Sequence, residues 1–244
     1  ESVLYALCRV GLYLAIARSG LSWRPAGRAR IPDSDFQPKL SHKGYIITMT
    51  DLSAFPITKK WPAEHPDRIQ LYSLPTPNGV KVSIMLEETG LPYEPHLVRF
   101  DTNDQMSAEF MSLNPNNKIP AIIDPNGLGG KPLPLFESGA ILLYLAEKFG
   151  KFLPTDPAKR TATLSWLFWQ MGSAPILGGG FGHFFAYAPE KYEYPINRYT
   201  MEVKRQLDVL DRHLAENDYL AGDEYSIADI AVWPWYAGVL LNRV

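Results

Sequence analysis

The order of strand and helix patterns between residues 69 and 150 restricts the fold of this chain more than any other feature of its sequence. Seven patterns follow one another in the order βαβαββα, at residues 69–74, 77–89, 93–100, 107–113, 121–124, 134–136 and 138–149. Gly90 and Gly150 end two of the helix patterns, and turns rich in proline, glycine and asparagine separate the strands. This order requires a mixed sheet that is covered by helices.

The second half of the chain is helical throughout. Helix patterns cover residues 158–171 and 194–217, and in the second of them apolar side chains recur every three or four residues from Ile196 to Leu214. The run Ser226–Asp229 is a variant of the capping box, with aspartate where glutamate or glutamine is usual, and it begins a third helix. An all-α domain is therefore expected to follow the α/β domain.

We expect three parts, which are an N-terminal extension, an α/β domain and an all-α domain, at residues 1–66, 67–154 and 157–244. The extension is rich in arginine and has no acidic residue between Glu1 and Asp33, which resembles an organellar transit peptide. The alternative is that this segment is not native and that translation starts at Met49. A cytoplasmic protein is expected, or a mitochondrial one if the transit segment is real.

The charge and the cysteine content exclude several classes of function. Lys and Arg together number 24 and Asp and Glu number 26, so no strong field attracts nucleic acid or an anionic membrane. The single cysteine, Cys8, excludes a disulfide framework within the chain and a zinc site built on several thiolates. His183 and His213 have no partner at metal-ligand spacing. We therefore expect no nucleic acid, no membrane span and no metal.

Two short motifs fit a single ligand. Asn116–Pro120 is followed by Phe136–Ala140, and a γ-glutamyl tripeptide would satisfy both. Glu137 suits the ammonium group of such a ligand, and Ser138, at a helix N-terminus, offers its hydroxyl and free N–H groups to the carboxylate. A cis peptide between Ile119 and Pro120 would turn the Ile119 backbone outward, where it pairs with the ligand like an added strand. The alternative is that the first pair only caps a helix and that the proline only begins a strand.

Together with Thr76–Gly79, these motifs resemble the N-terminal domain of glutathione transferases. The phrases Pro77–Gly79, Asn116–Pro120 and Phe136–Ala146 are similar to the nu class and to its fungal nitrogen-regulator relatives. The same class is suggested by four runs in the helical half, Trp166–Trp169, Gly178–His183, Ile196–Tyr199 and Ser226–Ile230. The resemblance covers about residues 68 to 244. It implies a thioredoxin-like domain followed by the helical glutathione transferase domain, which we expect to be incomplete because the class continues beyond Val244.

The resemblance also implies roles for individual residues. Thr76 and Asn78 lie beside the glutathione sulfur, where a helix N-terminus stabilises a thiolate, although Asn78 is also a candidate for a simple N-cap. Residues that hold the tripeptide are implied at Gln105, Lys118, Ile119, Pro120, Glu137 and Ser138. Arg198 reaches the ligand from the helical domain, and its alternative is an ordinary surface arginine. Tyr72 falls within a strand and is not expected to take part.

The implied function is that of an enzyme that uses glutathione as co-substrate. Because Cys8 lies outside the fold, the thiol must come from bound glutathione, and we expect reduction of disulfides or peroxides with weaker conjugation to electrophiles. The alternative is a non-catalytic glutathione-binding regulator, but residues 1–66 lack the Asn/Gln-rich arm of such proteins. A homodimer is also expected. The physical reason to expect a dimer is that the two long helices offer more apolar surface than one chain readily covers. The alternative is that this surface forms the core of a single chain.

Overall fold

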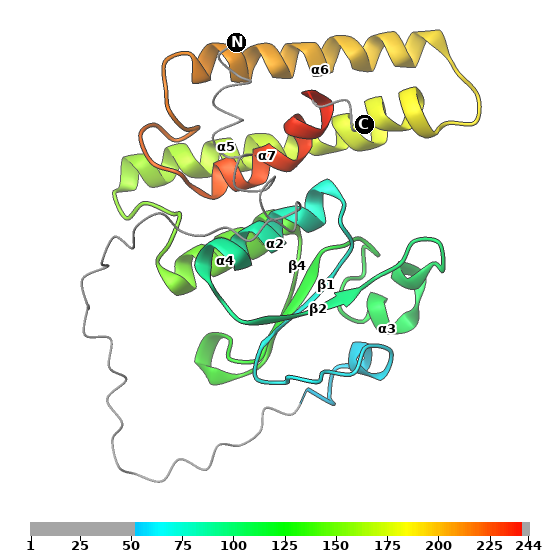
Figure 1. Ribbon diagram of the computed structural model, residues 1–244, viewed down its shortest axis with the longest axis vertical. Helices are drawn as coiled ribbons and strands as arrows, with labels where there is room; N and C mark the ends of the chain where they lie inside the picture. Colours follow the sequence, from blue (N-terminus) through cyan, green and yellow to red (C-terminus); the bar gives the residue numbers. More distant parts are fainter. Residues whose placement is uncertain (1–51, 241–244) are drawn as a thin grey trace, which may run out of the picture.

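The structure, a computed structural model, describes residues 52–240 of the 244 in the chain. The interpretations of the transit segment, of Cys8 and of Met49 as a start lie outside the described residues. An α/β part with a sheet occupies the lower half of Figure 1, and an all-helical part lies above it. The expected thioredoxin-like domain followed by a helical domain is confirmed.

The sheet has four strands in the order β2-β1-β3-β4. Their bounds are Ile69–Ser73 for β1, Tyr93–Leu97 for β2, Ala121–Asp124 for β3 and Leu133–Phe136 for β4. Strand β2 runs parallel to β1, β3 runs antiparallel to β1, and β4 runs antiparallel to β3. The ends of β1, β2 and β4 and the start of β3 therefore lie at one end of the sheet.

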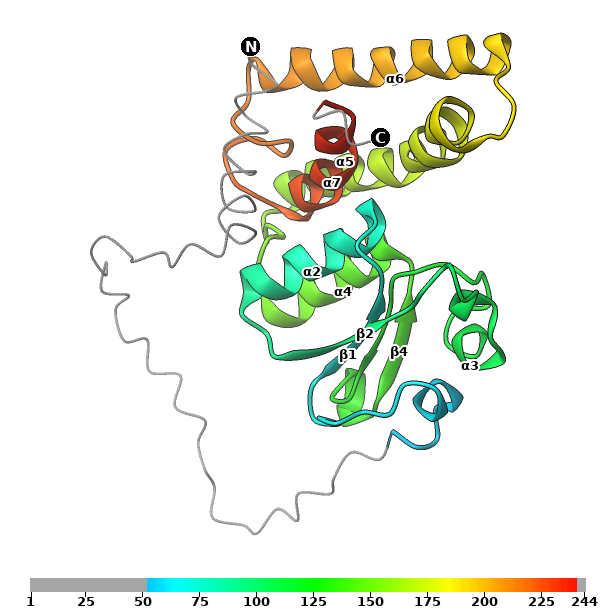
Figure 2. The same cartoon turned by 45° about the vertical axis from the view of Figure 1, so that its right-hand side comes forward.

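Two helices cover one face of the sheet. They are α2 (Pro77–Thr89) and α4 (Ser138–Phe149), and each ends at a left-handed glycine, Gly90 and Gly150. Leu71 from β1 packs with apolar side chains of both helices and of the helical part, so these helices lie between the sheet and the helices above (Figure 2). Both helices have the bounds that the sequence patterns predict.

The other face of the sheet is covered by the short helix α3 (Ala108–Met111) and by the segment that precedes β1. That segment includes a single helical turn, η1 (Pro56–Lys59), whose Ile57 is fully buried. The Glu94 carboxylate of β2 accepts hydrogen bonds from the backbone N–H groups of Glu64 and His65, at 2.8 and 2.7 Å. Residues 52–67 are thus bound to the sheet by specific contacts.

The helical part consists of three α-helices and one wider π-helical segment. Their bounds are Pro157–Pro175 for α5, Ile176–Tyr187 for the π-helical segment η4, Glu193–Leu214 for α6 and Ile227–Leu240 for α7. Helix α5 continues beyond the predicted end at residue 171 and runs directly into η4. In η4, a Cβ atom on Gly178 would lie only 2.7 Å from the Trp235 ring, so this glycine allows the indole to approach the backbone.

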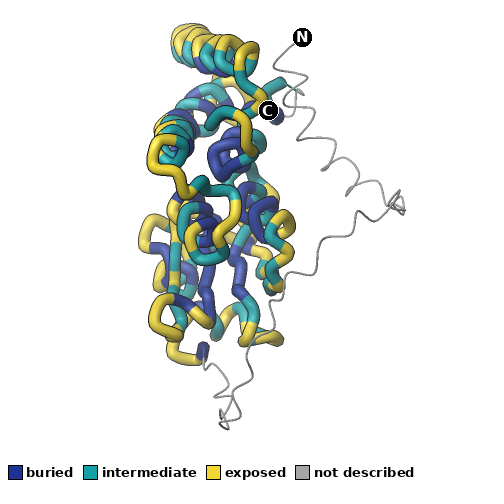
Figure 3. The backbone as a smooth tube through the Cα atoms, turned by 90° about the vertical axis from the view of Figure 1, so that its left-hand side faces the viewer, coloured by how far each residue is buried: buried dark blue, intermediate teal, exposed yellow. Residues whose placement is uncertain are grey.

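The start of α7 confirms the predicted capping box. The Asp229 carboxylate accepts from the Ser226 N–H at 2.9 Å, and the Ser226 hydroxyl oxygen accepts from the Ala228 N–H at 3.3 Å. Helix α7 is largely buried, whereas α6 at the top of Figure 3 has an exposed outer side. None of the helices in the described part of the chain is long and apolar enough to cross a bilayer.

Candidate functional site

The sheet topology brings the predicted site segments to one end of the sheet. Thr76 and Asn78 follow β1, and the Ile119–Pro120 peptide, which is cis as predicted, precedes β3. Ala121 pairs with Tyr72 of β1 and with Phe136 of β4, so the entry to β3 lies between the ends of those two strands. Glu137 comes directly after Phe136. The residues from both motifs are therefore neighbours in space.

Thr76 and Asn78 have different roles at the N-terminus of α2. Thr76 is the N-cap, because its hydroxyl oxygen accepts from the Gly79 N–H at 3.5 Å. The alternative that Asn78 is the cap is therefore wrong. Its Oδ1 instead accepts from Lys81 Nζ and from Trp235 Nε1, each at 2.8 Å. Within residues 52–240, the Asn78 NH₂ group has no hydrogen-bond acceptor, so it is free to bind a ligand atom.

Lys81 is buried where helix α2 meets helix α5, which is an unusual position for a lysine. It is fully buried, and its Nζ donates to Gln170 Oε1 of α5 at 2.6 Å as well as to Asn78. Burial lowers the pKa of Lys81 to about 7, although the nearby negative charge of Glu137 acts in the opposite direction. The amine is thus held by two amide oxygens where water would otherwise solvate it.

The pKa of Lys81 predicts how stability depends on pH. An unfolded lysine keeps its proton until about pH 10.5, whereas the folded one loses it near 7, so the unfolded state binds more protons between these values. The free energy of unfolding of the unsubstituted protein should therefore rise with pH across this window relative to that of Lys81→Met, by on the order of 5 kcal/mol. Denaturant titrations of both proteins at several pH values measure this difference, and a difference independent of pH would contradict the assignment.

Glu137 and Ser138 present an uncapped helix N-terminus. Glu137 occupies the N-cap position of α4, but its side chain makes no capping hydrogen bond, so the alternative of an ordinary side-chain cap is wrong. Its φ of 72° lies in the left-handed region that favours glycine, and its side chain is exposed. Ser138 is buried, with its hydroxyl 3.8 Å from Met171 Sδ. The first N–H groups of α4 are therefore left for an external carboxylate.

Two substitutions at Glu137 distinguish the destabilisation caused by its strained backbone from the contribution of its charge to ligand binding. Glu137→Gly should raise the free energy of unfolding by about 1 kcal/mol, because glycine adopts this φ without strain. The same change should weaken glutathione binding about ten-fold or more through the loss of a charged partner. Glu137→Gln, which keeps the strain but removes the charge, should weaken binding equally without the gain in stability. Calorimetric titration and denaturant unfolding test both, and unchanged affinity in both variants would exclude the predicted role.

The Ile119 backbone and the Gln105 side chain offer further unused polar groups. Neither the N–H nor the C=O of Ile119 makes a backbone hydrogen bond to another residue in the described range. Gln105 Oε1 is buried and has no partner among residues 52–240. Lys118 has an exposed side chain, and its carbonyl accepts from Asn114 Nδ2 at 2.6 Å. These groups suit a peptide ligand that lies along the end of the sheet.

We call the residues at this end of the sheet the cluster; they are Thr76, Asn78, Gln105, Ile119, Glu137 and Ser138. Arg198 makes no contact with the cluster among the interactions of residues 52–240. It lies on α6, its side chain is 60% exposed, and its guanidinium is 3.9 Å from Glu202. Tyr72 is buried on the sheet face away from α2, where burial raises its pKa and keeps the phenol neutral. No group of three or more His, Cys, Asp or Glu residues within 52–240 could hold a metal ion.

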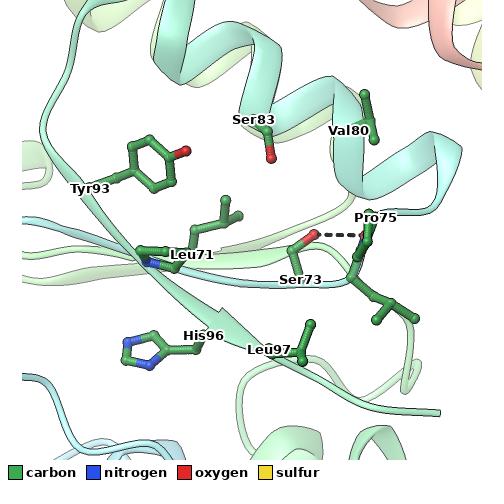
Figure 4. A pocket seen from close by; sticks show the side chains of 10 residues that line it. Leu71, Ser73, Pro75, Val80, Ser83, Tyr93, His96 and Leu97 are labelled. Carbon is green, nitrogen blue, oxygen red and sulfur yellow. Dashed lines mark hydrogen bonds between the residues drawn. The ribbon is translucent and has the colours of Figure 1, made fainter. Parts of the chain in front are cut away.

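A cavity of about 310 Å³ lies between α2 and strands β1 and β2, and its lining includes Pro75 and Val80 on either side of Thr76–Gly79 (Figure 4). None of the predicted site residues lines it. Its polar side chains are already used, since the Tyr93 hydroxyl donates to Glu87 and His96 Nε2 is 2.8 Å from Gln70 Oε1. The candidate site is therefore the cluster at the end of the sheet.

Comparison with known families agrees with this geometry. The model of the glutathione S-transferase N-terminal domain matches residues 68–147, and that of the C-terminal domain matches residues 193–240, which together are more than half of the chain. The chain belongs to the glutathione S-transferase family. Among the relatives of this chain is the disulfide-bond oxidoreductase YghU of Escherichia coli (strain K12), which is 59% identical over 187 residues. The match covers 74% of this chain and 64% of YghU, so the chain spans less than two thirds of that relative's length.

Two solved structures of glutathione transferases are also similar to this chain. One, from Burkholderia graminis, has two glutathione molecules bound per subunit, with a TM-score of 0.78 and 64% identity over 80% of this chain and 82% of that one. The other, from Pseudomonas putida, has one glutathione disulfide bound per subunit, with a TM-score of 0.76 and 61% identity over 79% of this chain and 84% of that one.

Sequence patterns missed three residues that support Asn78 from the surrounding helices. Lys81 and Trp235 donate to the Asn78 carbonyl oxygen, and Gln170 accepts a second hydrogen bond from Lys81. Lys81 has a weak signal in the sequence, because it lies one helical turn after Asn78 and is preceded and followed by valine. Gln170 and Trp235 have no local signal, since they meet Lys81 and Asn78 only through the packing of α5 and α7 on α2.

Proposed function

We propose that this chain is a glutathione-dependent disulfide reductase of the nu class. One observation carries the proposal: the free NH₂ group of Asn78 lies at the N-terminus of α2, at the same end of the sheet as the uncapped N-terminus of α4 and the unpaired Ile119 backbone. The bound glutathione disulfide in the Pseudomonas putida structure and the name of YghU support the same chemistry.

In this proposal, the thiol end and the γ-glutamyl end of glutathione meet different helix N-termini. The Asn78 NH₂ group and the Thr76 hydroxyl donate to the sulfur, and the positive end of α2 favours the thiolate over the thiol. The Thr76 oxygen accepts from the Gly79 N–H through a lone pair, so its own proton remains available. Glu137 pairs with the ammonium group, and the first N–H groups of α4 bind the carboxylate.

The reaction is a pair of thiol–disulfide exchanges. The bound thiolate attacks one sulfur of the substrate disulfide, forms a mixed disulfide and releases the other sulfur as a thiolate. A second glutathione thiolate then attacks the mixed disulfide and releases the remaining substrate thiol, leaving glutathione disulfide. The stabilised thiolate would also attack a peroxide oxygen, and we include small peroxides and electrophiles among the proposed substrates.

Turnover tests the proposal against a non-catalytic regulator. The chain is assayed with glutathione and a small symmetric disulfide, with formation of glutathione disulfide followed through glutathione reductase and NADPH, and glutathione affinity is measured by calorimetry. We expect saturable turnover well above the rate without protein. Tight binding with no turnover would instead favour the regulator.

We also propose that the chain forms a homodimer. The stripe on α6 supports this less than its sequence suggests, because Val203 and Leu210 are buried within the single chain. Support comes from Phe168 and Met201, which are 66% and 63% exposed on the helical part. A stable pair typically buries more than about 1,200 Å² in total. Light scattering at micromolar concentration tests this, and a monomer with full glutathione affinity would rule it out.

A further inference from the structure

The hydrogen bonds of Asn78 determine which end of its amide faces the ligand. An indole N–H and a lysine amine both act as donors here, so the Asn78 atom that receives both must be the carbonyl oxygen. With Oδ1 turned toward Lys81 and Trp235, the NH₂ group is directed to the other side. That group has no acceptor anywhere in residues 52–240. The amide is therefore oriented before any ligand binds.

Lys81 is the only donor of these two that is itself fixed by a second bond. Its Nζ lies 2.8 Å from Asn78 Oδ1 and 2.6 Å from Gln170 Oε1, and both Lys81 and Gln170 are completely buried. Lys81 and Asn78 are on α2, whereas Gln170 is on α5 of the helical part. The lysine thus joins the start of α2 to the helical part at the position of the amide.

The lysine can make both bonds in either protonation state. Burial lowers its pKa to about 7, with Glu137 opposing that shift, so both forms are present near neutral pH. A neutral amine keeps two N–H groups, which equals the number of amide oxygens that it faces, and the charged form has three. The orientation of Asn78 therefore does not depend on the charge of Lys81.

We infer that Lys81 is a positioning residue, which holds the Asn78 amide with its oxygen inward and its NH₂ group toward the glutathione sulfur. This inference rests on the proposed function, because it assigns the sulfur to the N-terminus of α2. Lys81 does not touch the reacting atoms. Together with Trp235 Nε1, it prevents the amide from rotating to place its oxygen, which repels a thiolate, where the NH₂ group belongs.

Three variants separate positioning from structural support. Lys81→Met removes the donor at similar volume, and the double variant Lys81→Met/Gln170→Met also removes the Gln170 oxygen that would otherwise be buried without a donor. The control is Lys148→Met, which removes another lysine with two hydrogen bonds in the same domain, to Asp124 and Asn126. All three should lose some stability, and the double variant should lose less than Lys81→Met.

The thiol pKa of bound glutathione, followed through thiolate absorbance, distinguishes the variants. Both Lys81 variants should raise this pKa by about 1 unit and lower kcat about ten-fold, with KM for glutathione changed less than about two-fold. Lys148→Met should leave both quantities as in the unsubstituted protein. A folded double variant with an unchanged thiol pKa and unchanged kcat would overturn the inference.

A measurement on the apo-protein keeps this test independent of turnover. The side-chain NH₂ resonances of Asn78, assigned through their loss in Asn78→Ala, should shift and broaden in either Lys81 variant before glutathione is added. In the unsubstituted protein, the same resonances should shift when glutathione binds. Resonances that glutathione leaves unmoved would overturn the inference even if neither variant folds. Binding without turnover in the unsubstituted protein would instead refute only the proposed disulfide reduction.

Discussion

Replacing Asn78 by aspartate is expected to lower kcat for glutathione-dependent disulfide reduction by about 10²- to 10³-fold while the chain stays folded. Aspartate keeps an oxygen for Lys81 Nζ and Trp235 Nε1, which both lie 2.8 Å from Asn78 Oδ1. The NH₂ group, however, becomes a second carboxylate oxygen, and its negative charge repels the thiolate. Steady-state kinetics and the thiol pKa of bound glutathione measure the effect.

Two further variants distinguish the loss of the NH₂ donor from the effect of an added negative charge. Asn78→Ala removes the donor without adding a charge, so its loss of kcat should be smaller. It should, however, lower the free energy of unfolding by about 1–3 kcal/mol, because Lys81 and Trp235 lose their acceptor. Asn197→Asp, at an exposed position on α6, adds the same charge far from α2 and should leave kcat unchanged. An Asn78→Asp protein with undiminished kcat would remove Asn78 from the mechanism.

The elements that the sequence predicts well are those with local signals at both ends. Helix α2 begins after the Thr76 cap and ends at Gly90, and α4 ends at Gly150, where φ is 64°. Glycine can adopt these values without strain, so it marks the ends of the helices in the sequence itself. The cis peptide and the capping box of α7 were likewise predictable, because each depends on residues adjacent in the chain.

The features that the sequence does not predict depend on distant partners. Lys81 and Gln170 are 89 positions apart, and a lysine in a helix is usually exposed, so its burial follows only from the packing of α5 on α2. The segment before β1 has no helix or strand period, yet Glu94 binds its backbone at two N–H groups. In the π-helical segment, the missing side chain of Gly178 leaves space for Trp235, which is distant in the sequence.

The predicted site residues likewise fall into those that the sheet topology brings together and one, Arg198, whose position depends on helix packing. Thr76, Asn78, Ile119 and Glu137 flank strands that pair with one another, so the sheet topology alone brings them together. Arg198 belongs to a different element, and its position relative to them depends on the packing of α6, which leaves it exposed beside Glu202. Its role in binding glutathione remains a prediction.

Replacing Gly79 by alanine is expected to lower the free energy of unfolding by about 3 kcal/mol, near the upper end for an added methyl group. A Cβ atom on Gly79 would overlap the Leu74 carbonyl oxygen and lie 2.5 Å from Ser73 Oγ. The first of these is backbone at the end of β1, which cannot rotate away as a side chain does. The start of α2 must therefore move away from β1, and Asn78 moves with it. Denaturant unfolding measures the loss, and disulfide turnover should fall with it.

Gly172→Ala is the matched control for this change. Gly172 lies inside α5, and no atom lies within 4 Å of the position that its Cβ would occupy. Alanine should therefore raise the free energy of unfolding by up to about 1 kcal/mol, because it favours helix over the unfolded chain more than glycine does. If Gly79→Ala lowers the free energy of unfolding and Gly172→Ala raises it, the destabilisation arises at the contact between α2 and β1. A Gly79→Ala protein as stable as Gly172→Ala would mean that α2 does not approach Leu74 this closely, and the orientation of Asn78 would have to be revised.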